Sequence, residues 1–102
     1  MINNICLTEI EILPIKPKNG LVAFASCVLN KSFYIGNIVI HTTPYGNFRV
    51  VYPTKVLPNG KHISCFHPIN REAGEAISSA ILERYKNLIM DIEAEKVARL
   101  EF

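Results

Sequence analysis

The segment KHISCFHPINREAGEAISSAILERY, residues 61–85, contains the change of periodicity that decides the fold of this chain. Before Pro68 the apolar residues alternate with polar ones, as they do in a β-strand. After Asn70 they recur at steps of three and four, which is the pattern of one face of an α-helix. The stripe consists of Ala73, Ala76, Ile77, Ala80, Ile81, Tyr85 and Leu88. We predict an amphipathic helix over about residues 71–89, followed by a helical or frayed tail over 90–102.

Asn70 marks the predicted start of this helix. Its side-chain oxygen can accept a hydrogen bond from an N–H group of the first turn. Glu72 and Glu75 lie near the same end, where a negative charge suits the helix dipole. The alanines of the stripe are small, so we expect the helix to lie close to a sheet.

The residues before the helix predict that sheet. Runs rich in apolar, aromatic and β-branched residues predict about five strands between residues 4 and 67, at 5–13, 21–29, 33–41, 48–52 and 61–66. The turns between these runs are short, so neighbouring strands should be antiparallel. The predicted fold class is therefore α+β, an antiparallel sheet of about five strands followed by a C-terminal helix.

Two of the predicted strands have features of their own. The first alternates loosely, which allows a bulge, and Pro14 and Pro17 should end it. Residues 21–29 are apolar at successive positions, which is typical of a strand that is covered on both faces.

Length and composition favour one small cytoplasmic domain. The chain has 102 residues, so we assign residues 1–102 to a single domain. It has no apolar run of the ~18 residues that a membrane helix needs, and its first residues lack the pattern of a signal peptide. We therefore predict a cytoplasmic location and no membrane partner. Cys6, Cys27 and Cys65 are widely spaced within apolar runs, which predicts buried, unreactive thiols rather than disulfides.

The charges are distributed unevenly along the chain. The net charge is only +2, but no acidic residue occurs from Ile12 to Arg71. That stretch holds seven cations, Lys16, Lys18, Lys31, Arg49, Lys55, Lys61 and Arg71. A basic middle beside an acidic C-terminal part favours a polyanionic partner. Surface lysines that protect strand edges from unwanted pairing would give the same pattern, and charge alone leaves both interpretations open.

Several short elements together resemble a known family. In order and spacing, the stage V sporulation protein G (SpoVG) family is matched by residues 20–41, Tyr52-Pro53-Thr54-Lys55, Pro58-Asn59-Gly60, His67-Pro68-Ile69-Asn70 and residues 80–85. The resemblance covers about residues 5–88. It implies a small bacterial protein with an antiparallel sheet and a C-terminal helix that forms a homodimer. It also implies a regulator, linked to sporulation and to septum formation, that binds DNA and in some members RNA.

The resemblance also implies where nucleic acid would bind. In the family, a basic pair after the proline–small residue step contributes to the contact; here Lys55 matches its first member, and Val56 replaces the usual Arg. Ile63 and Ser64 stand in place of a common Arg-Asp pair, and Arg49 replaces an apolar residue. We expect Arg49 and Lys61 to restore the lost charge. The predicted nucleic-acid-binding residues are Lys55, Arg49, Lys61, Arg71, Thr54 and Tyr45.

Other side chains favour neither catalysis nor a cofactor. Most aromatic rings should be core, with Tyr45 at a turn tip the most exposed; the set is Tyr34, Tyr45, Phe48, Tyr52 and Phe66. Cys65 and His67 share one face of an extended strand while His62 falls on the other, so these three would not converge on a metal. We predict no catalytic residues, no metal, no cofactor and no small-molecule substrate.

Two main functions remain. The first is a dimeric regulator that binds DNA, or RNA as well, and controls septation, sporulation and gene expression. The alternative is a protein-interaction module that acts on cell division through a protein partner, without specific nucleic-acid binding. A third interpretation, a relative whose regulatory role has drifted, is motivated by Val56.

Overall fold

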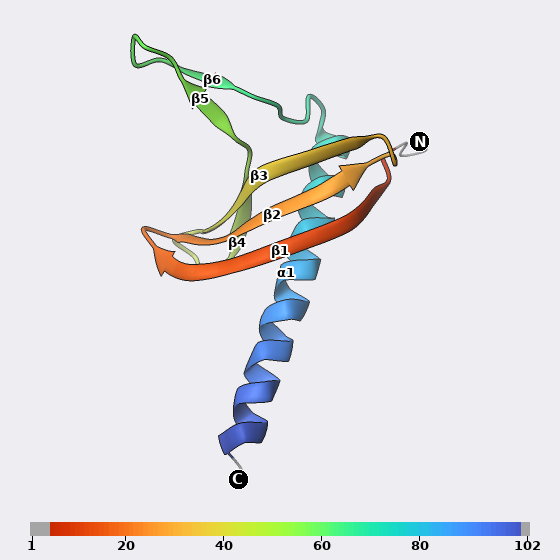
Figure 1. Ribbon diagram of the computed structural model, residues 1–102, viewed down its shortest axis with the longest axis vertical. Helices are drawn as coiled ribbons and strands as arrows, with labels where there is room; N and C mark the ends of the chain where they lie inside the picture. Colours follow the sequence, from red (N-terminus) through yellow and green to blue (C-terminus); the bar gives the residue numbers. More distant parts are fainter. Residues whose placement is uncertain (1–4, 101–102) are drawn as a thin grey trace.

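The computed structural model describes residues 5–100, with their side chains as far as Glu95 (Figure 1). Four antiparallel strands form the main sheet in sequence order: β1 (Leu7–Lys18), β2 (Leu21–Leu29), β3 (Phe33–Thr42) and β4 (Phe48–Val51). A second, small antiparallel sheet consists of β5 (Thr54–Val56) and β6 (His62–Ser64). One helix follows, α1 (Arg71–Leu100). The predicted α+β fold, an antiparallel sheet followed by a C-terminal helix, is confirmed.

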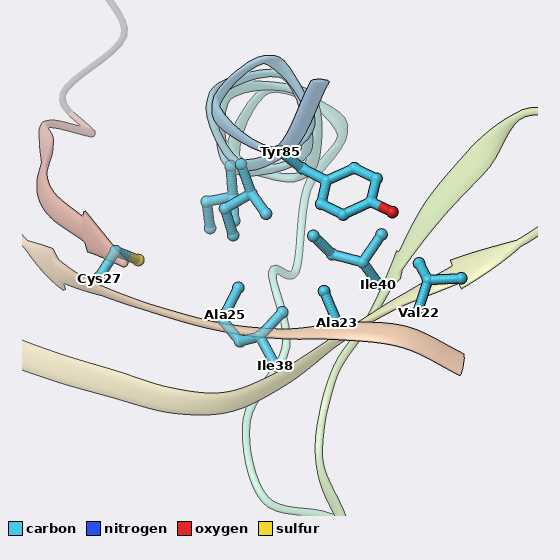
Figure 2. Packing of buried hydrophobic residues seen from close by; sticks show 9 residues of the cluster. Val22, Ala23, Ala25, Cys27, Ile38, Ile40 and Tyr85 are labelled. Carbon is cyan, nitrogen blue, oxygen red and sulfur yellow. The ribbon is translucent and has the colours of Figure 1, made fainter. Parts of the chain in front are cut away.

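The hydrophobic core lies between α1 and one face of the main sheet (Figure 1, Figure 2). The helix contributes buried side chains at intervals of four residues, Ala73, Ile77, Ile81 and Tyr85, which confirms the predicted stripe. The sheet contributes Val22, Ala23, Ala25 and Cys27 from β2, and Ile38 and Ile40 from β3. Figure 2 shows Ala23, Ala25 and Ile40 pointing from the sheet toward the helix. The small β2 side chains let the helix approach closely, and the branched β3 side chains fill the space beside them.

The helix begins where the sequence predicts. The Ala73 N–H donates to the Asn70 side-chain oxygen at 2.8 Å, which is the expected N-cap bond. The helix then continues without a break to Leu100. Residues 90–100 of the predicted tail are therefore helical, and the rest of that tail lies outside the described residues.

The prediction that Pro14 and Pro17 end the first strand is wrong, because β1 continues to Lys18. β1 is an edge strand that pairs only with β2, and at an edge one side of the strand makes no ladder bonds, so proline is tolerated. The pairing with β2 shifts register between Pro14 and Lys18, the stretch that contains the prolines. The predicted bulge is confirmed earlier in the strand, where the register shifts around Glu9, whose φ is 51°.

The expected fifth strand does not join the main sheet. Of residues 61–66, only His62–Ser64 is a strand, and it pairs with Thr54–Val56, a segment expected to be a loop between strands. Pro53 lies between β4 and β5, and a proline cannot donate to a continuing ladder. The chain leaves the main sheet there, and the resulting β5–β6 hairpin projects away from it at the upper left of Figure 1.

The face of the sheet opposite α1, which we call the outer face, is apolar and open. Strand pairing places one row across it, in which Phe24 is flanked by Leu13 and Val39, and Val39 is paired with Val51. Leu13 is 64% exposed, Phe24 38%, and Tyr34, beside the row, 73%. The prediction that residues 21–29 are covered on both faces is therefore wrong for a single chain. We define the outer face by Leu13, Phe24, Val39, Val51 and Tyr34.

The burial of the cysteines also departs from the sequence-based expectation. Cys27 is fully buried as predicted, but Cys6 and Cys65 are exposed. Cys6 precedes β1, and Cys65 follows β6 of the projecting hairpin, so neither lies in a strand that packs against the helix. Of the aromatic rings, Tyr45 is exposed as predicted, and Tyr34 is exposed against the expectation. The other three, Phe48, Tyr52 and Phe66, are partly buried against the core.

Candidate nucleic-acid interface

The β5–β6 hairpin carries three of the six predicted binding residues, Thr54, Lys55 and Lys61. All six strand residues of the hairpin are exposed. Its loop is held by paired backbone bonds, from the Leu57 N–H to the Lys61 carbonyl at 2.8 Å and from the Gly60 N–H to the Leu57 carbonyl at 2.9 Å. Gly60 has a φ of 85°, which this turn requires and which glycine adopts without strain. The loop therefore presents its residues in a defined geometry.

The cations of this hairpin have no carboxylate partner among the described side chains. The ion pair that the described residues form joins Arg71 to Glu75, and it involves neither Lys55 nor Lys61. The sequence explains this, since no acidic residue occurs from Ile12 to Arg71. Two exposed ammonium groups on a projecting ribbon can approach a phosphate backbone without first breaking an ion pair.

The hairpin has apolar side chains next to Lys55, where the family resemblance leads one to expect a second basic residue. Val56 is 59% exposed, and its strand partner is His62. Ile63, opposite Lys55, is exposed as well. The surface around Lys55 is thus more apolar than a pair of adjacent basic residues would make it.

Tyr45 and Arg49 lie together at a different place, beside an open hollow of about 850 Å³ at one end of the main sheet. The hollow lies between the β1–β2 turn, which contains Gly20, and the β3–β4 turn, which contains Tyr45. Tyr45 is 89% exposed, and Arg49 is exposed on β4 opposite His41 of β3. The structure therefore brings these two predicted residues together, but in a group separate from the hairpin.

Arg71, the sixth predicted residue, is the least suited of the set to contact a phosphate. It is the first residue of α1 and its Nε lies 3.4 Å from Oε1 of Glu75 in an i,i+4 pair. A cation at the N-terminal end of a helix is opposed by the helix dipole, and the carboxylate partly neutralises it. Both side chains are exposed, so the pair contributes little to stability.

The hollow is also lined by His41, Asn19 and Asn47, which are not among the six predicted residues. The sequence does indicate that these residues lie near Tyr45. In an antiparallel sheet of consecutive strands, alternate turns lie at the same end, so the Asn19-Gly20 turn and the residue 43–46 turn must be neighbours. Both turns are recognisable in the sequence, and only the order of the strands was needed to join them.

The described residues offer little for catalysis. Burial raises the pKa of the Cys27 thiol, which keeps it protonated and poorly nucleophilic at neutral pH. Among the residues that the structure describes, no group of three His, Cys, Asp or Glu side chains is arranged to hold a metal ion. Of His62, Cys65 and His67, the last forms a hydrogen bond between its Nδ1 and the Ser64 hydroxyl at 2.7 Å. In the same described part, no helix has both the length and the apolar character that crossing a membrane would need.

Comparison with known proteins agrees with the fold and the motifs. The family model described as SpoVG matches residues 5–87. A protein of Exiguobacterium is 32% identical over 85% of this chain and 85% of its own length. A protein of Clostridium beijerinckii is 28% identical over 83% of this chain and 92% of its own length, and one of Treponema denticola is 29% identical over 78% and 85%. The name of each marks it as a candidate septation protein SpoVG.

Proposed function

Because this chain belongs to the SpoVG family, we propose that it is a dimeric nucleic-acid-binding regulator. It acts in the cytoplasm, has no enzymatic activity, and controls septation, sporulation and gene expression. The septation role comes from the names of its relatives. The observation that carries the nucleic-acid role is the β5–β6 hairpin, in which Lys55 and Lys61 are exposed and have no carboxylate partner among the described side chains.

Electrostatics supports this proposal in two ways. Phosphate contacts supply most of the affinity of a protein for nucleic acid, and lysine makes them as a point charge. The hairpin belongs to a stretch of 60 residues, from Ile12 to Arg71, without a carboxylate, so a phosphate approaching it meets no local repulsion. With Val56 in place of the family's second basic residue, each chain offers few contacts, and a dimer doubles them.

The outer face supports the homodimer. It exposes Leu13, Phe24 and Tyr34 around a hollow of about 350 Å³. A large exposed apolar patch on a small domain is typical of an interaction surface. A domain of this length also has a thin core, so burying this face against a second copy would stabilise the fold. Symmetry then presents two hairpins to one nucleic acid.

A test of the proposal is the salt dependence of binding. Fluorescence anisotropy with labelled duplex DNA, single-stranded DNA and RNA, from about 50 mM to about 200 mM salt, measures how many counterions are released. A dimer that engages about four phosphates through Lys55 and Lys61 gives a log–log slope of about −3 to −4. Lys55→Ala should flatten that slope, while Lys31→Ala, which removes an exposed lysine from the β2–β3 turn, should leave it unchanged.

Two results would sink the proposal. One is no binding to any of the three ligands at low salt. The other is an equal change of the salt-dependence slope in Lys55→Ala and Lys31→Ala. That result would mean that the phosphate contacts are not made at a particular site. A gain-of-function variant sharpens the test: Val56→Arg restores the family's basic pair, and it should strengthen duplex binding and steepen the slope by about one phosphate contact per chain.

A protein-interaction module remains the second candidate, and a specific observation favours it. Val56 and Ile63, on the two strands of the hairpin, are 59% and 47% exposed. Exposed apolar side chains on a projecting ribbon suit contact with a protein partner. In that case Val56→Arg would abolish partner binding without creating affinity for nucleic acid.

A further inference from the structure

The hollow between the β1–β2 and β3–β4 turns is pre-formed by backbone hydrogen bonds. The Thr42 N–H donates to the Gly20 carbonyl at 2.8 Å, which ties the end of β3 to the β1–β2 turn. Within the second turn, the Thr43 N–H donates to the Asn47 carbonyl at 2.8 Å, and the Asn47 N–H donates to the Thr43 hydroxyl oxygen at 3.2 Å. The walls of the hollow therefore need no rearrangement to receive a ligand.

The wall between the two turns is packed tightly around His41. Gly20 has a φ of 86°, and a Cβ at this position would collide with the His41 ring. The ring is also held by a hydrogen bond, in which Nδ1–H donates to the Thr42 carbonyl at 3.0 Å. In a neutral imidazole the other nitrogen, Nε2, then remains a hydrogen-bond acceptor. His41 thus gives the hollow a fixed polar wall.

The chemistry of the lining suits a base and its phosphate. Tyr45 offers an aromatic ring that is 89% exposed at the rim. Arg49 supplies a guanidinium group, and Asn19 and Asn47 supply side-chain amides that can both donate and accept. None of the described lining residues is acidic, so an anion meets attraction only. An exposed aromatic ring beside a cation and amide groups is the combination with which proteins bind unstacked bases.

We propose that this hollow is a single-strand subsite, in which an unstacked base lies against Tyr45 and its phosphate contacts Arg49. The inference rests on the proposed function and refines it. A duplex keeps its bases stacked inside, so it can contact the lysines of the hairpin but cannot place a base on the Tyr45 ring. Single-stranded DNA or RNA, by contrast, gains from both surfaces. The protein should therefore distinguish single strands from duplexes through Tyr45.

The hollow adjoins the outer face that we assign to the dimer, because His41 and Arg49 lie two residues from Val39 and Val51 along the same strands and so on the same side of the sheet. The outer-face hollow is lined by Glu11, Leu13, Phe24, Ser26, Tyr34 and their neighbours, and it shares no lining residue with the hollow beside Tyr45. Tyr45 itself lies in the β3–β4 turn, beyond the strands that form the outer face. Substitution of Tyr45 should leave the dimer intact.

The test compares labelled single strands of about 15 nucleotides, as DNA and as RNA, with a duplex of the same sequence. Tyr45→Ala should weaken binding of the single strands about fivefold to tenfold and change duplex affinity less than about twofold, because one stacked base is lost. Tyr45→Phe keeps the ring and should bind single strands as the wild type does. Arg49→Ala should also weaken single-strand binding, and the arm with the larger loss identifies DNA or RNA as the preferred strand.

The outcomes separate this inference from the proposed function. If Tyr45→Ala binds single strands as well as the wild type does, the subsite is disproved while the hairpin proposal stands. The same holds if the wild type binds only the duplex, or if Tyr45→Ala weakens duplex and single strand equally. If the wild type binds neither form, both proposals fail. Tyr45 is exposed and lies outside the hydrophobic core, so Tyr45→Ala should fold as the wild type does.

Discussion

The two faces of the main sheet differ in what covers them. On the inner face, β2 presents Ala23, Ala25 and Cys27, which are buried beneath α1. On the outer face, the same strand presents Phe24, which is 38% exposed. The strand is largely apolar on both faces, with Ser26 as the polar exception on the outer one, yet the chain itself covers only the inner face among the described residues. Apolar character thus predicts that a face is to be covered, but it does not predict whether the cover is the same molecule or another one.

The sizes of the β2 side chains also differ between the two faces and indicate what packs on each. The inner positions of β2 are small, as a closely packed helix requires, whereas the outer positions include a large aromatic ring. Large rings bury much area at low entropic cost and are favoured at interfaces. The difference between the two faces can be tested by removing side chains from each.

The largest effect is expected on the inner face, at Ile81, which is fully buried between α1 and the sheet. Ile81→Ala removes buried methyl groups and leaves a cavity, so it should lower the free energy of unfolding by about 3 to 4 kcal/mol. Ile69→Ala is the matched control, because Ile69 is 87% exposed and its loss should cost less than about 0.5 kcal/mol. Urea denaturation measures both. Equal losses would contradict the placement of the core.

A smaller effect is expected on the outer face, and it should appear in association. Leu13→Ser removes an apolar side chain from the proposed dimer interface, so it should raise the Kd of the dimer about tenfold, or about 1.4 kcal/mol. Sedimentation velocity across a range of concentrations measures it. The matched control is Ile69→Ser. Ile69 is also an exposed apolar residue but lies outside the outer face, so this substitution should leave the Kd unchanged. A wild-type protein that stays monomeric at all concentrations would remove the dimer from the proposal.

Removing the N-cap of α1, the helix that covers the inner face, should change the free energy of unfolding by a similar or smaller amount. Asn70→Ala removes the acceptor for the Ala73 N–H, so the free energy of unfolding should fall by about 1 kcal/mol. Asn70→Asp keeps an acceptor and should cost little. Thermal or urea denaturation followed by circular dichroism compares the three proteins, and an unaffected Asn70→Ala variant would show that the cap bond is dispensable.

The smallest effect is expected from raising the pH, and it again concerns the inner face. Burial raises the pKa of Cys27 above its ordinary value of about 9, and burial likewise raises the pKa of Tyr85 above about 10. Above those values the unfolded chain loses these protons while the folded chain retains them, so stability should fall as the pH rises past 9. Denaturation at a series of alkaline pH values measures this, and Cys27→Ala should reduce the effect. Stability that rises over this range would contradict it.

The helix and the order of the strands follow from local signals in the sequence. The four-residue spacing of Ala73, Ile77, Ile81 and Tyr85 and the cap at Asn70 are local properties, and each is confirmed. The predicted end of β1 at Pro14 and Pro17 is wrong, because a strand tolerates proline at a sheet edge and no local pattern reveals which strand is the edge. The separate β5–β6 sheet was missed for a related reason, since pairing between distant short runs is set by the whole fold.

The candidate interface was predictable in part. Lys55 and Lys61 could be selected from the family motif and the absence of acids, and the structure places both on one hairpin. Tyr45 and Arg49 were selected for separate reasons, and only the fold shows that they lie at one hollow. Arg71 was selected for its charge, but its pairing with Glu75 became visible only when both were placed on one helical turn.

If nucleic acid binds through the β5–β6 hairpin, as we propose, mapping the contact by NMR should show it. Amide chemical-shift changes should be recorded during titration with duplex and with single-stranded DNA. We predict that the largest changes occur at residues 54–64 with both ligands, with added changes at residues 43–49 for the single strand. Residues 30–33, at the opposite end of the sheet, should not respond. Changes confined to the outer face or to α1, with an unaffected hairpin, would contradict the account.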